Sequence, residues 1–337
     1  MQSFTLAENI KGFTDKRQGY THYKPRLDFG DHSYEYTEDT GTSFTVTYGE
    51  RKLGVSTVCD GHSGYETSFS VTSIIQRLFE AAISECLGCV KTALSRLFEM
   101  IASEMLTKKM FLGNSGTTCN VTVFDPANEK IFVASLGDSP TLLYRKDDNG
   151  NYKLLCKSED QDCADKNEIE RMIEIHKKHG DLNATAESVV FEVQSGGKPT
   201  GVFRNRRSQM MIHSSFGDYC RDYYPGVMNT VPRVYEWDFA RSDKLVAVQC
   251  SDGLLEWLQP SFIGIQPSTE FRSEEIGTHL DECNFTNGDN AAFVLHELQI
   301  DSMLKKRIAE HPFRSDSTRE WIVTTFDNHI TNVFVYE

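Results

Sequence analysis

Residues 43–64 read SFTVTYGERKLGVSTVCDGHSG. Apolar and polar side chains alternate over residues 43–48, a Gly-Glu-Arg-Lys turn follows, and a largely apolar run over residues 54–59 leads to Asp60. A period of two on both sides of a short turn is typical of a β-hairpin. The stretch therefore predicts two antiparallel strands, the second of which ends at the Asp-Gly-His sequence of residues 60–62.

Both helical and strand patterns follow this hairpin along the chain. Apolar side chains recur at intervals of three and four between residues 66 and 110, which predicts two helices broken near Gly88. Asp165 and Gly180 are typical cap residues for one more helix, at residues 166–179. Further strands are expected at 120–124, 130–135, 141–145, 208–212, 244–250 and 326–336, the first three as one antiparallel meander. This order of elements is not a βα repeat, so it predicts an α+β fold with an antiparallel sheet core.

The domain organisation is expected to be simple. The length of 337 residues is compatible with one large domain, and no internal repeat or low-complexity linker divides the sequence. Residues 1–30 have no clear period and are expected to form an irregular N-terminal arm. Residues 31–300 are expected to form the main domain. Residues 301–337 then form either a C-terminal extension, with a basic amphipathic helix at 304–309, or the final strand of the same domain.

The composition excludes several classes of partner. With 35 Lys and Arg against 49 Asp and Glu, the net charge of −14 repels a phosphate backbone, so no nucleic-acid partner is expected. No apolar run approaches the roughly 20 residues of a membrane-spanning helix, and the first residues lack a signal pattern, so no membrane partner is expected. We expect a monomer in the cytoplasm or the nucleus.

The nine cysteines indicate a reducing compartment. Their number is odd and several lie in apolar segments, among them Cys59, Cys119 and Cys250, which is typical of buried free thiols. Cys86 and Cys89 have the spacing of half a zinc site, yet no second pair of ligands lies in reach to complete a tetrahedron. We therefore expect no structural zinc.

Acidic residues stand at the ends of several predicted strands. These positions are Glu38 with Asp39, Asp60, Asp138, Asp252 and Asp289. Taken singly, an acidic residue there is usually part of a turn or a helix cap. Several carboxylates at the strand ends of one sheet can converge, however, and hard oxygen ligands suit Mg²⁺ or Mn²⁺. Two such ions about 3.5–4 Å apart can activate a water and clamp the oxygens of a phosphoryl displacement. His62 is then a candidate to protonate the leaving oxygen.

Seven short motifs stand in a defined order along residues 30–300. They are Thr37-Glu38-Asp39, Asp60-Gly61-His62-Ser63-Gly64, Ser115-Gly116-Thr117-Thr118, Val133-Ala134-Ser135-Leu136-Gly137-Asp138-Ser139, Ser215-Phe216-Gly217-Asp218, Ser251-Asp252-Gly253 and Gly288-Asp289-Asn290. In these motifs the sequence resembles the type-2C, metal-dependent protein Ser/Thr phosphatases (PPM-type). The resemblance implies a four-layer α-β-β-α sandwich with two antiparallel central sheets, and a metal site in a cleft at one end of the sheets.

The resemblance also implies the metal ligands. Two Mg²⁺ or Mn²⁺ ions are expected as cofactors, with Asp60 bridging both and the carbonyl of Gly61 on one of them. Asp252 and Asp289 are expected on the other ion. The last ligand has an alternative, because Asp327 stands at the start of the predicted terminal strand.

Further roles follow from the same resemblance. Glu38 and Asp39 are expected to hold metal-bound waters, and Asp138 matches a ligand of a weaker third metal in some members. His62 is expected to be the general acid. The implied reaction is hydrolysis of phosphoserine or phosphothreonine in proteins by a water that bridges the two ions.

The sequence departs from the family at its phosphate-binding positions. Tyr34 stands where the family usually has an arginine that grips the substrate phosphate, Ser214 replaces a second arginine, and Pro140 follows Gly-Asp-Ser in place of a third. Loss of an arginine removes a bidentate phosphate contact. The candidate substitutes for the missing contact are Lys24, Arg26, Arg204, Arg206 and Arg207. The alternatives to a protein phosphatase are therefore a weak or inactive pseudophosphatase that acts as a binding scaffold, and a phosphatase of a non-protein phosphate.

Overall fold

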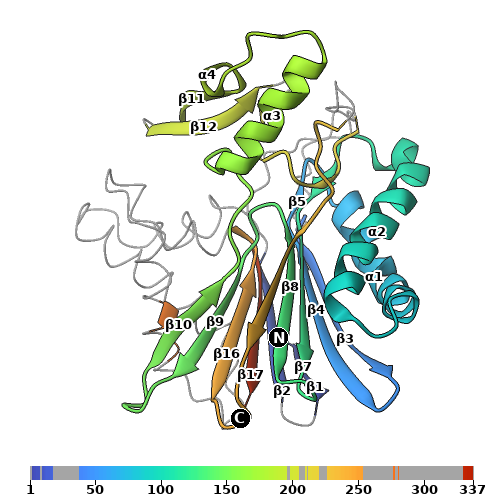
Figure 1. Ribbon diagram of the computed structural model, residues 1–337, viewed down its shortest axis with the longest axis vertical. Coiled ribbons are helices and arrows are strands. Elements are labelled where there is room, and N and C mark those ends of the chain that lie inside the picture. Colours follow the sequence, from blue (N-terminus) through green and yellow to red (C-terminus); the bar gives the residue numbers. More distant parts are fainter. Residues whose placement is uncertain are drawn as a thin grey trace, which may run out of the picture.

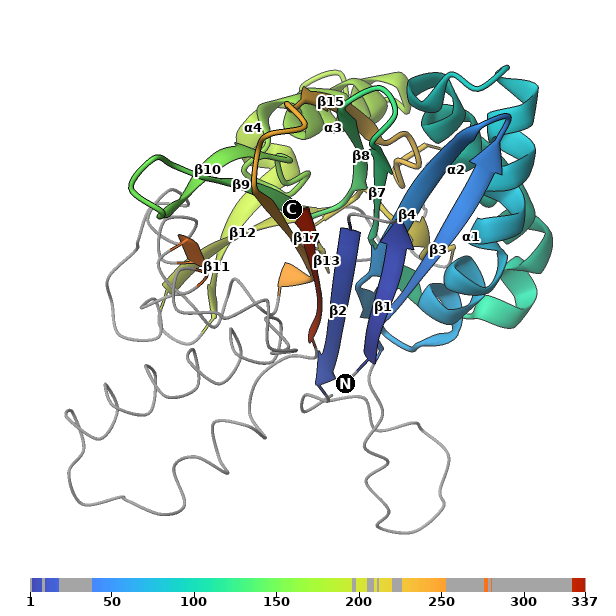
Figure 2. The same ribbon diagram turned by 90° about the horizontal axis from the view of Figure 1, so that it is seen from below.

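The computed structural model describes residues 2–7, 10–17, 38–195, 198–204, 209–210, 212–219, 226–252, 276–277, 280 and 329–336. Two antiparallel sheets pack against each other at its centre (Figures 1 and 2). The five-stranded sheet has the order β15-β8-β7-β4-β3, formed by Arg233–Asp238, Lys130–Leu136, Cys119–Asp125, Arg51–Cys59 and Thr40–Tyr48. The six-stranded sheet has the order β1-β2-β17-β16-β9-β10, formed by Gln2–Ala7, Ile10–Arg17, His329–Tyr336, Leu245–Cys250, Thr141–Lys146 and Tyr152–Lys157.

The hairpin predicted from residues 43–64 is confirmed. β3 pairs with β4 in continuous register, and the turn between them places Gly49 at a φ of +61°. β4 pairs with β7 on its other edge, and every residue from Leu53 to Cys59 is buried. The apolar run in β4 follows from this position, because helices cover one face of the strand and the second sheet covers the other.

Two helices cover the outer face of the five-stranded sheet (Figure 1). They are α1 (Glu66–Glu85) and α2 (Val90–Leu112), which confirms the predicted pair with a break at Gly88. Fully buried side chains such as Phe79 of α1 and Phe98 of α2 form one core with the residues of the sheet that face the helices. A second core fills the space between the two sheets and includes Val133, Ala247 and Phe334.

The N-terminal segment differs from the expected irregular arm. β1 and β2 form a hairpin within residues 1–30, and β2 pairs with β17 along its whole length. The partner strand lies at the opposite end of the sequence, so no local pattern around residues 1–30 indicates this pairing. β17 itself confirms the strand predicted at the C-terminus. The division of the chain into arm, main domain and extension stays a prediction, and the helix expected at 304–309 lies outside the described residues.

The predicted meander is wrong in its third strand. β7 and β8 pair as expected, but β9 leaves for the six-stranded sheet, where it lies between β16 and β10. The turn between β8 and β9 contains Gly137 at a φ of +94° and Pro140. Since proline has no N–H for a strand ladder, the chain can change sheets there.

Smaller elements lie beyond one end of the sandwich. One three-stranded sheet has the order β14-β6-β5, formed by Phe216–Gly217, Gly116–Thr117 and Gly61–His62. The other has the order β11-β12-β13, formed by Val190–Ser195, Lys198–Arg204 and Gln209–Met210, so the strand expected at 208–212 is shorter than predicted. The latter lies with α3 (Lys166–Lys178) and α4 (Ala186–Val189) at the top of Figure 1. The carboxylate of Asp165 accepts the N–H of Asn167 at 3.0 Å, which confirms the predicted N-cap of α3.

The architecture confirms an α+β fold with two antiparallel central sheets in a sandwich. The helix layer expected on the six-stranded sheet lies outside the described residues. Of the helices that are described, none is long and apolar enough to cross a membrane. The described cysteines are all free, and Cys59, Cys119 and Cys250 are buried as predicted.

Buried polar side chains join the two sheets near the end of the sandwich beyond which the smaller elements lie. The hydroxyl of Ser56 in β4 donates to Oε1 of Gln249 in β16 at 2.7 Å. Nε2 of Gln249 in turn donates to Oδ1 of Asn120 in β7 at 2.8 Å. All three residues are fully buried. These hydrogen bonds fix the position of β16 relative to the other sheet, three residues before Asp252.

We expect the Gln249→Leu variant to lower the free energy of unfolding by about 1–3 kcal/mol, because buried polar atoms of Ser56 and Asn120 lose a partner. Urea denaturation followed by circular dichroism measures the change. The matched control is Gln76→Leu on the exposed face of α1, which should change the free energy by less than about 0.5 kcal/mol. Equal effects of the two substitutions would contradict a bridging role for Gln249.

Candidate metal centre and its neighbouring histidine

Three carboxylates converge at one end of the sandwich. Asp60 follows β4, Asp138 lies in the turn between β8 and β9, and Asp252 follows β16. Each offers one oxygen, and these oxygens all lie within 4.8 Å of one another. Within the described ranges, no other group of three His, Cys, Asp or Glu side chains is placed in this way. Because β4 and β16 belong to different sheets, the packing of the two sheets creates the cluster.

The backbone of Asp60 is fixed by Thr117 of β6 and by Thr118, which follows it. Its carbonyl oxygen accepts the hydroxyl of Thr117 and the N–H of Thr118, both at 2.9 Å. Its N–H donates to the hydroxyl of Thr118 at 3.1 Å. Asp60 is therefore held at the end of its strand before any ligand is bound.

The electrostatics of the cluster are unfavourable without a cation. Burial raises the pKa of Asp138 well above its usual range, and repulsion from Asp252, Asp160 and Asp162 raises it further. A divalent cation would offset this repulsion, and carboxylate oxygens are the hard ligands that Mg²⁺ and Mn²⁺ prefer. The donor set therefore fits such an ion.

Asp160 and Asp162 approach the cluster because their loop, which follows β10, is attached to Gly137. Oε1 of Gln161 accepts the N–H of Gly137 at 3.1 Å, and the N–H of Gln161 donates to the carbonyl of Gly137 at 2.9 Å. Sequence analysis missed both aspartates. The loop has the composition of an ordinary polar turn, so no local signal distinguishes it.

Glu38 and Asp39 hold the loop that follows Asp60. Oε1 of Glu38 accepts the N–H of Gly64 at 2.7 Å, and Oδ1 of Asp39 accepts the N–H of Gly61 at 3.3 Å. A side chain at position 61 would clash, since its Cβ would lie 2.2 Å from the carbonyl oxygen of Glu38. Burial raises the pKa of Glu38, although the bond from Gly64 acts against this effect. At least one oxygen of each carboxylate thus positions the loop.

His62 is paired with a buried carboxylate. Its Nε2 lies 2.7 Å from Oδ2 of Asp218; the His62 side chain is 25% exposed and that of Asp218 is 0% exposed. The hydroxyl of Ser215 donates to the same oxygen at 2.8 Å. A carboxylate accepts hydrogen bonds, so Nε2 of His62 carries a hydrogen and Nδ1 is the nitrogen left for exchange with another group.

Gly116 allows this pair to form. In the small sheet β14-β6-β5, Gly116 pairs with His62 on one side and with Gly217 on the other. A Cβ at position 116 would lie 2.0 Å from Oδ2 of Asp218 and 2.2 Å from Nε2 of His62. Asp218 belongs to a motif that sequence analysis quoted, but its role as the partner of His62 was missed, since the two residues lie far apart in the sequence.

Only some of the remaining predicted site residues are among those that the structure describes. Asp289, its alternative Asp327 and Tyr34 lie outside the described residues, as do Lys24, Arg26, Arg206 and Arg207. Arg204 is the last residue of β12. Ser214, at the position of a family arginine, is fully buried and forms a backbone bridge with Asn229. Pro140 is also buried, and its carbonyl accepts the N–H of Cys250 at 3.1 Å.

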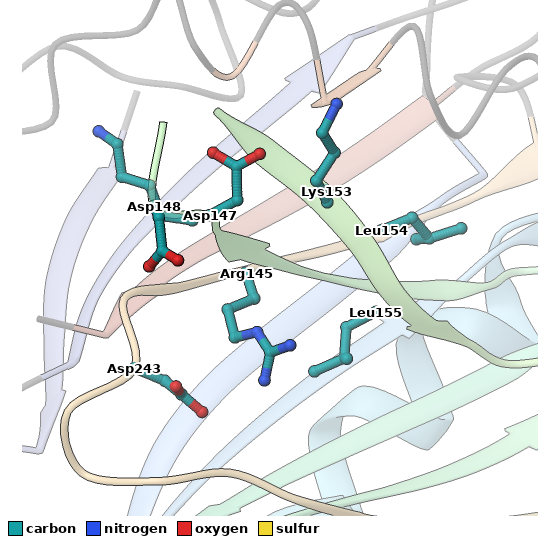
Figure 3. A pocket seen from close by; sticks show the side chains of 8 residues that line it. Arg145, Asp147, Asp148, Lys153, Leu154, Leu155 and Asp243 are labelled. Carbon is teal, nitrogen blue, oxygen red and sulfur yellow. The ribbon is translucent and has the colours of Figure 1, made fainter. Parts of the chain in front are cut away.

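A separate pocket of about 370 Å³ lies near the turn between β9 and β10 (Figure 3). Its lining includes Arg145, Asp147, Lys153 and Asp243. Asp138 precedes the start of β9, whereas Arg145 is near its end, so a strand about 20 Å long separates this pocket from the acidic cluster. None of the predicted site residues lines it.

Comparisons with known proteins agree with this geometry. The chain is similar in structure to a serine-threonine phosphatase 2C from Toxoplasma gondii, with a TM-score of 0.64, 15% sequence identity, and coverage of 99% of this chain and 96% of the other. It is also similar to a sex-determining protein of C. elegans, with a TM-score of 0.57 and 16% identity, where the match covers 98% of this chain and 65% of the other. A comparison with curated protein sequences finds no match. The family model described as protein phosphatase 2C matches residues 30–262. Since the match covers more than half of the chain, the protein belongs to the protein phosphatase 2C family, as its sequence motifs indicated.

Proposed function

We propose that the protein hydrolyses phosphoserine and phosphothreonine in other proteins, with Mg²⁺ or Mn²⁺ as cofactor. The observation that carries the proposal is the convergence of Asp60, Asp138 and Asp252, each with an oxygen within 4.8 Å of the others. Membership of the protein phosphatase 2C family supports the reaction type. Phosphoproteins are then the expected partners, and a monomer in the cytoplasm or nucleus stays a prediction.

Asp60, Asp252 and Asp289 would hold the two ions, together with the carbonyl of Gly61, and Asp138 would hold a weaker third ion. Bound there, two divalent ions supply Lewis-acid stabilisation of the charge on the phosphoryl oxygens. Glu38 and Asp39 keep the loop of residues 60–64 in place through its N–H groups. The ligand carboxylates come from two packed sheets and are in place before the substrate arrives. This lowers the cost of reorganising the site during the reaction.

His62 would protonate the leaving oxygen of the serine or threonine. Its Nε2 is held by Asp218, so the transferred proton would be the one on Nδ1. The buried Asp218 fixes the orientation of the ring, as a carboxylate does when it orients a general acid or base. Asp218 is a positioning residue here, because it acts through His62.

The last metal ligand provides a separate test. We expect Asp289→Ala to remove activity and weaken Mn²⁺ binding, since the Asn-Gly turn before Asp289 is suited to the ligand position. Asp327→Ala should change only the thermal stability. Titration calorimetry with Mn²⁺ on both variants measures the difference, and the reverse result would assign the ligand to the segment before β17.

Tyr34 tests whether the protein turns over substrate or only binds it. Without an arginine at this position, the natural protein should have a high KM for phosphopeptides and a measurable metal-dependent kcat. We expect Tyr34→Arg to lower KM roughly ten- to 100-fold, since a hydrogen bond to a charged group contributes about 1.5–3 kcal/mol. Tyr34→Phe is the matched control and should leave KM unchanged. If neither the natural protein nor Tyr34→Arg hydrolyses a phosphomonoester at saturating Mn²⁺, the protein is a pseudophosphatase scaffold.

A further inference from the structure

Cys86 and Cys89 are the first and last residues of a tight turn between α1 and α2. This turn has no role in the proposed phosphatase reaction. α1 ends at Glu85 and α2 begins at Val90, so the two cysteines occupy the ends of the connection. Cys89 is exposed and Cys86 is partly buried. Among the described residues, no third metal-binding side chain joins them.

The turn brings the two cysteines close together. The N–H of Cys89 donates to the carbonyl of Cys86 at 3.0 Å, as in a four-residue β-turn. The central residues Leu87 and Gly88 have φ values of +52° and +81°. In such a turn the outer Cα atoms lie less than about 7 Å apart, and disulfides span roughly 4.4–6.8 Å between Cα atoms. The Cα separation of such a turn therefore overlaps the range that a disulfide spans.

Contacts with the sheet hold the turn in this shape. Nη1 of Arg51 donates to the carbonyl of Gly88 at 2.9 Å. A Cβ on Gly88 would lie 2.4 Å from the ring of Tyr48, so the backbone of the turn packs directly on that side chain. A rigid turn keeps the two cysteine residues near each other, and this lowers the entropic cost of joining them.

The two thiols differ in reactivity. The hydroxyl of Thr92 lies 3.2 Å from Sγ of Cys89 and is the first cause of the lowered pKa of that thiol. The backbone N–H groups at the start of α2 add to the effect, while burial and the charge of Glu236 act against it. The pKa of Cys86 is raised, first by burial and then by the charge of Cys89. Cys89 is thus the better nucleophile, and Cys86 is the natural resolving thiol.

We propose that Cys86 and Cys89 form a thiol-exchange site that is oxidised reversibly by low-molecular-weight disulfides. The Cys89 thiolate attacks one sulfur of the disulfide RSSR, which forms Cys89–S–SR and releases RS⁻. Cys86 then loses its proton and attacks the Cys89 sulfur, which forms the Cys86–Cys89 disulfide and releases a second RS⁻. Two thiols are oxidised and one disulfide is reduced, so the electrons balance. The reverse exchange with a reduced thiol restores both cysteines.

Glutathione is the probe for the test. The reduced full-length protein is incubated with oxidised glutathione, quenched with acid, alkylated and digested with trypsin. Residues 78–91 form one tryptic peptide that contains only these two cysteines. We expect this peptide to lose two hydrogen atoms and to escape alkylation. Cys156 and Cys163, in peptides 154–157 and 158–166, are internal controls that should stay reduced, because burial raises the pKa of both thiols, that of Cys163 to about 11.

Three variants separate the steps. Cys86→Ser should retain one glutathione on Cys89, since the resolving thiol is absent. Cys89→Ser should leave Cys86 alkylated under the same conditions. Thr92→Val, which has the same shape on an exposed position of α2, should slow the reaction about two- to tenfold because the hydroxyl no longer stabilises the thiolate.

Three outcomes would overturn the proposal. These are persistent glutathione on Cys89 of the natural protein, a reaction of Cys89→Ser as fast as that of the natural protein, and oxidation of Cys156 or Cys163 before the 78–91 peptide. None of these readouts depends on phosphatase activity. The 20 residues of α1 place the turn about 30 Å from the loop of His62, so any activity of the protein should be the same in both redox states.

Discussion

Asp252→Asn is expected to abolish metal-dependent hydrolysis of phosphate esters. A neutral amide then replaces an anionic ligand at a doubly charged ion, while the shape of the side chain is kept. Loss of a group that only orients a metal ligand costs about 10- to 100-fold in affinity or activity, so loss of the ligand should cost at least about 100-fold. Steady-state turnover of an aryl phosphate at saturating Mn²⁺ measures the activity, and titration calorimetry measures Mn²⁺ affinity. Asp60→Asn should behave in the same way.

The stability of the metal-free protein gives a second readout for the same substitution. The carboxylate of Asp252 repels that of Asp138 in the cluster, so removing one charge should raise the Tm measured without metal. Added Mn²⁺ should raise the Tm of the natural protein and leave that of Asp252→Asn nearly unchanged. Asp148→Asn, an exposed substitution at the turn after β9, is the matched control and should change neither quantity. Unchanged Mn²⁺ affinity in both Asp60→Asn and Asp252→Asn would remove the assignment of the metal centre.

His62→Gln is expected to have the second largest effect, and the effect should depend on the leaving group. A phosphoserine peptide releases a basic alkoxide that needs a proton, so its kcat should fall by about 10²–10⁴-fold. An aryl phosphate releases a stable phenolate, so its kcat should change little. The ratio of the two rates is the measurement. Equal losses on both substrates would mean that His62 only packs against its neighbours.

Asp218 and Gly116 extend this test to the groups that position His62. Asp218→Asn keeps the size of the side chain but removes its charge, and should reduce phosphoserine turnover by a smaller factor than His62→Gln, with the same dependence on the leaving group. Gly116→Ala should have a similar effect, since the new methyl group would occupy the space between Asp218 Oδ2 and His62 Nε2. A loss that is uniform across substrates would indicate general distortion of the loop rather than a displaced general acid.

Local patterns in the sequence predict the helices and strands of the five-stranded layer and the candidate metal ligands. The alternation in residues 43–48 and the apolar run before Asp60 correspond to β3 and β4, because strand side chains alternate between a buried and an exposed face wherever one face is covered. The helical spacing after Glu66 corresponds to α1 and α2 for the same reason, at a period of 3.6 residues. The motifs around Asp60, Asp138 and Asp252 identified residue types that suit divalent cations.

The packing of the whole chain determines which of these strands pair and which of these side chains come together. β2 pairs with β17 from the other end of the chain, and β9 joins β16 rather than β8, because sheet order is set by packing between distant segments that leave no local period. The same holds at the site: Asp160 reaches the acidic cluster through a loop held by Gln161, and Asp218 reaches His62 across 156 residues of sequence. Side-chain chemistry is local and can be read from the sequence, whereas the distance between two side chains depends on the packing of the whole chain.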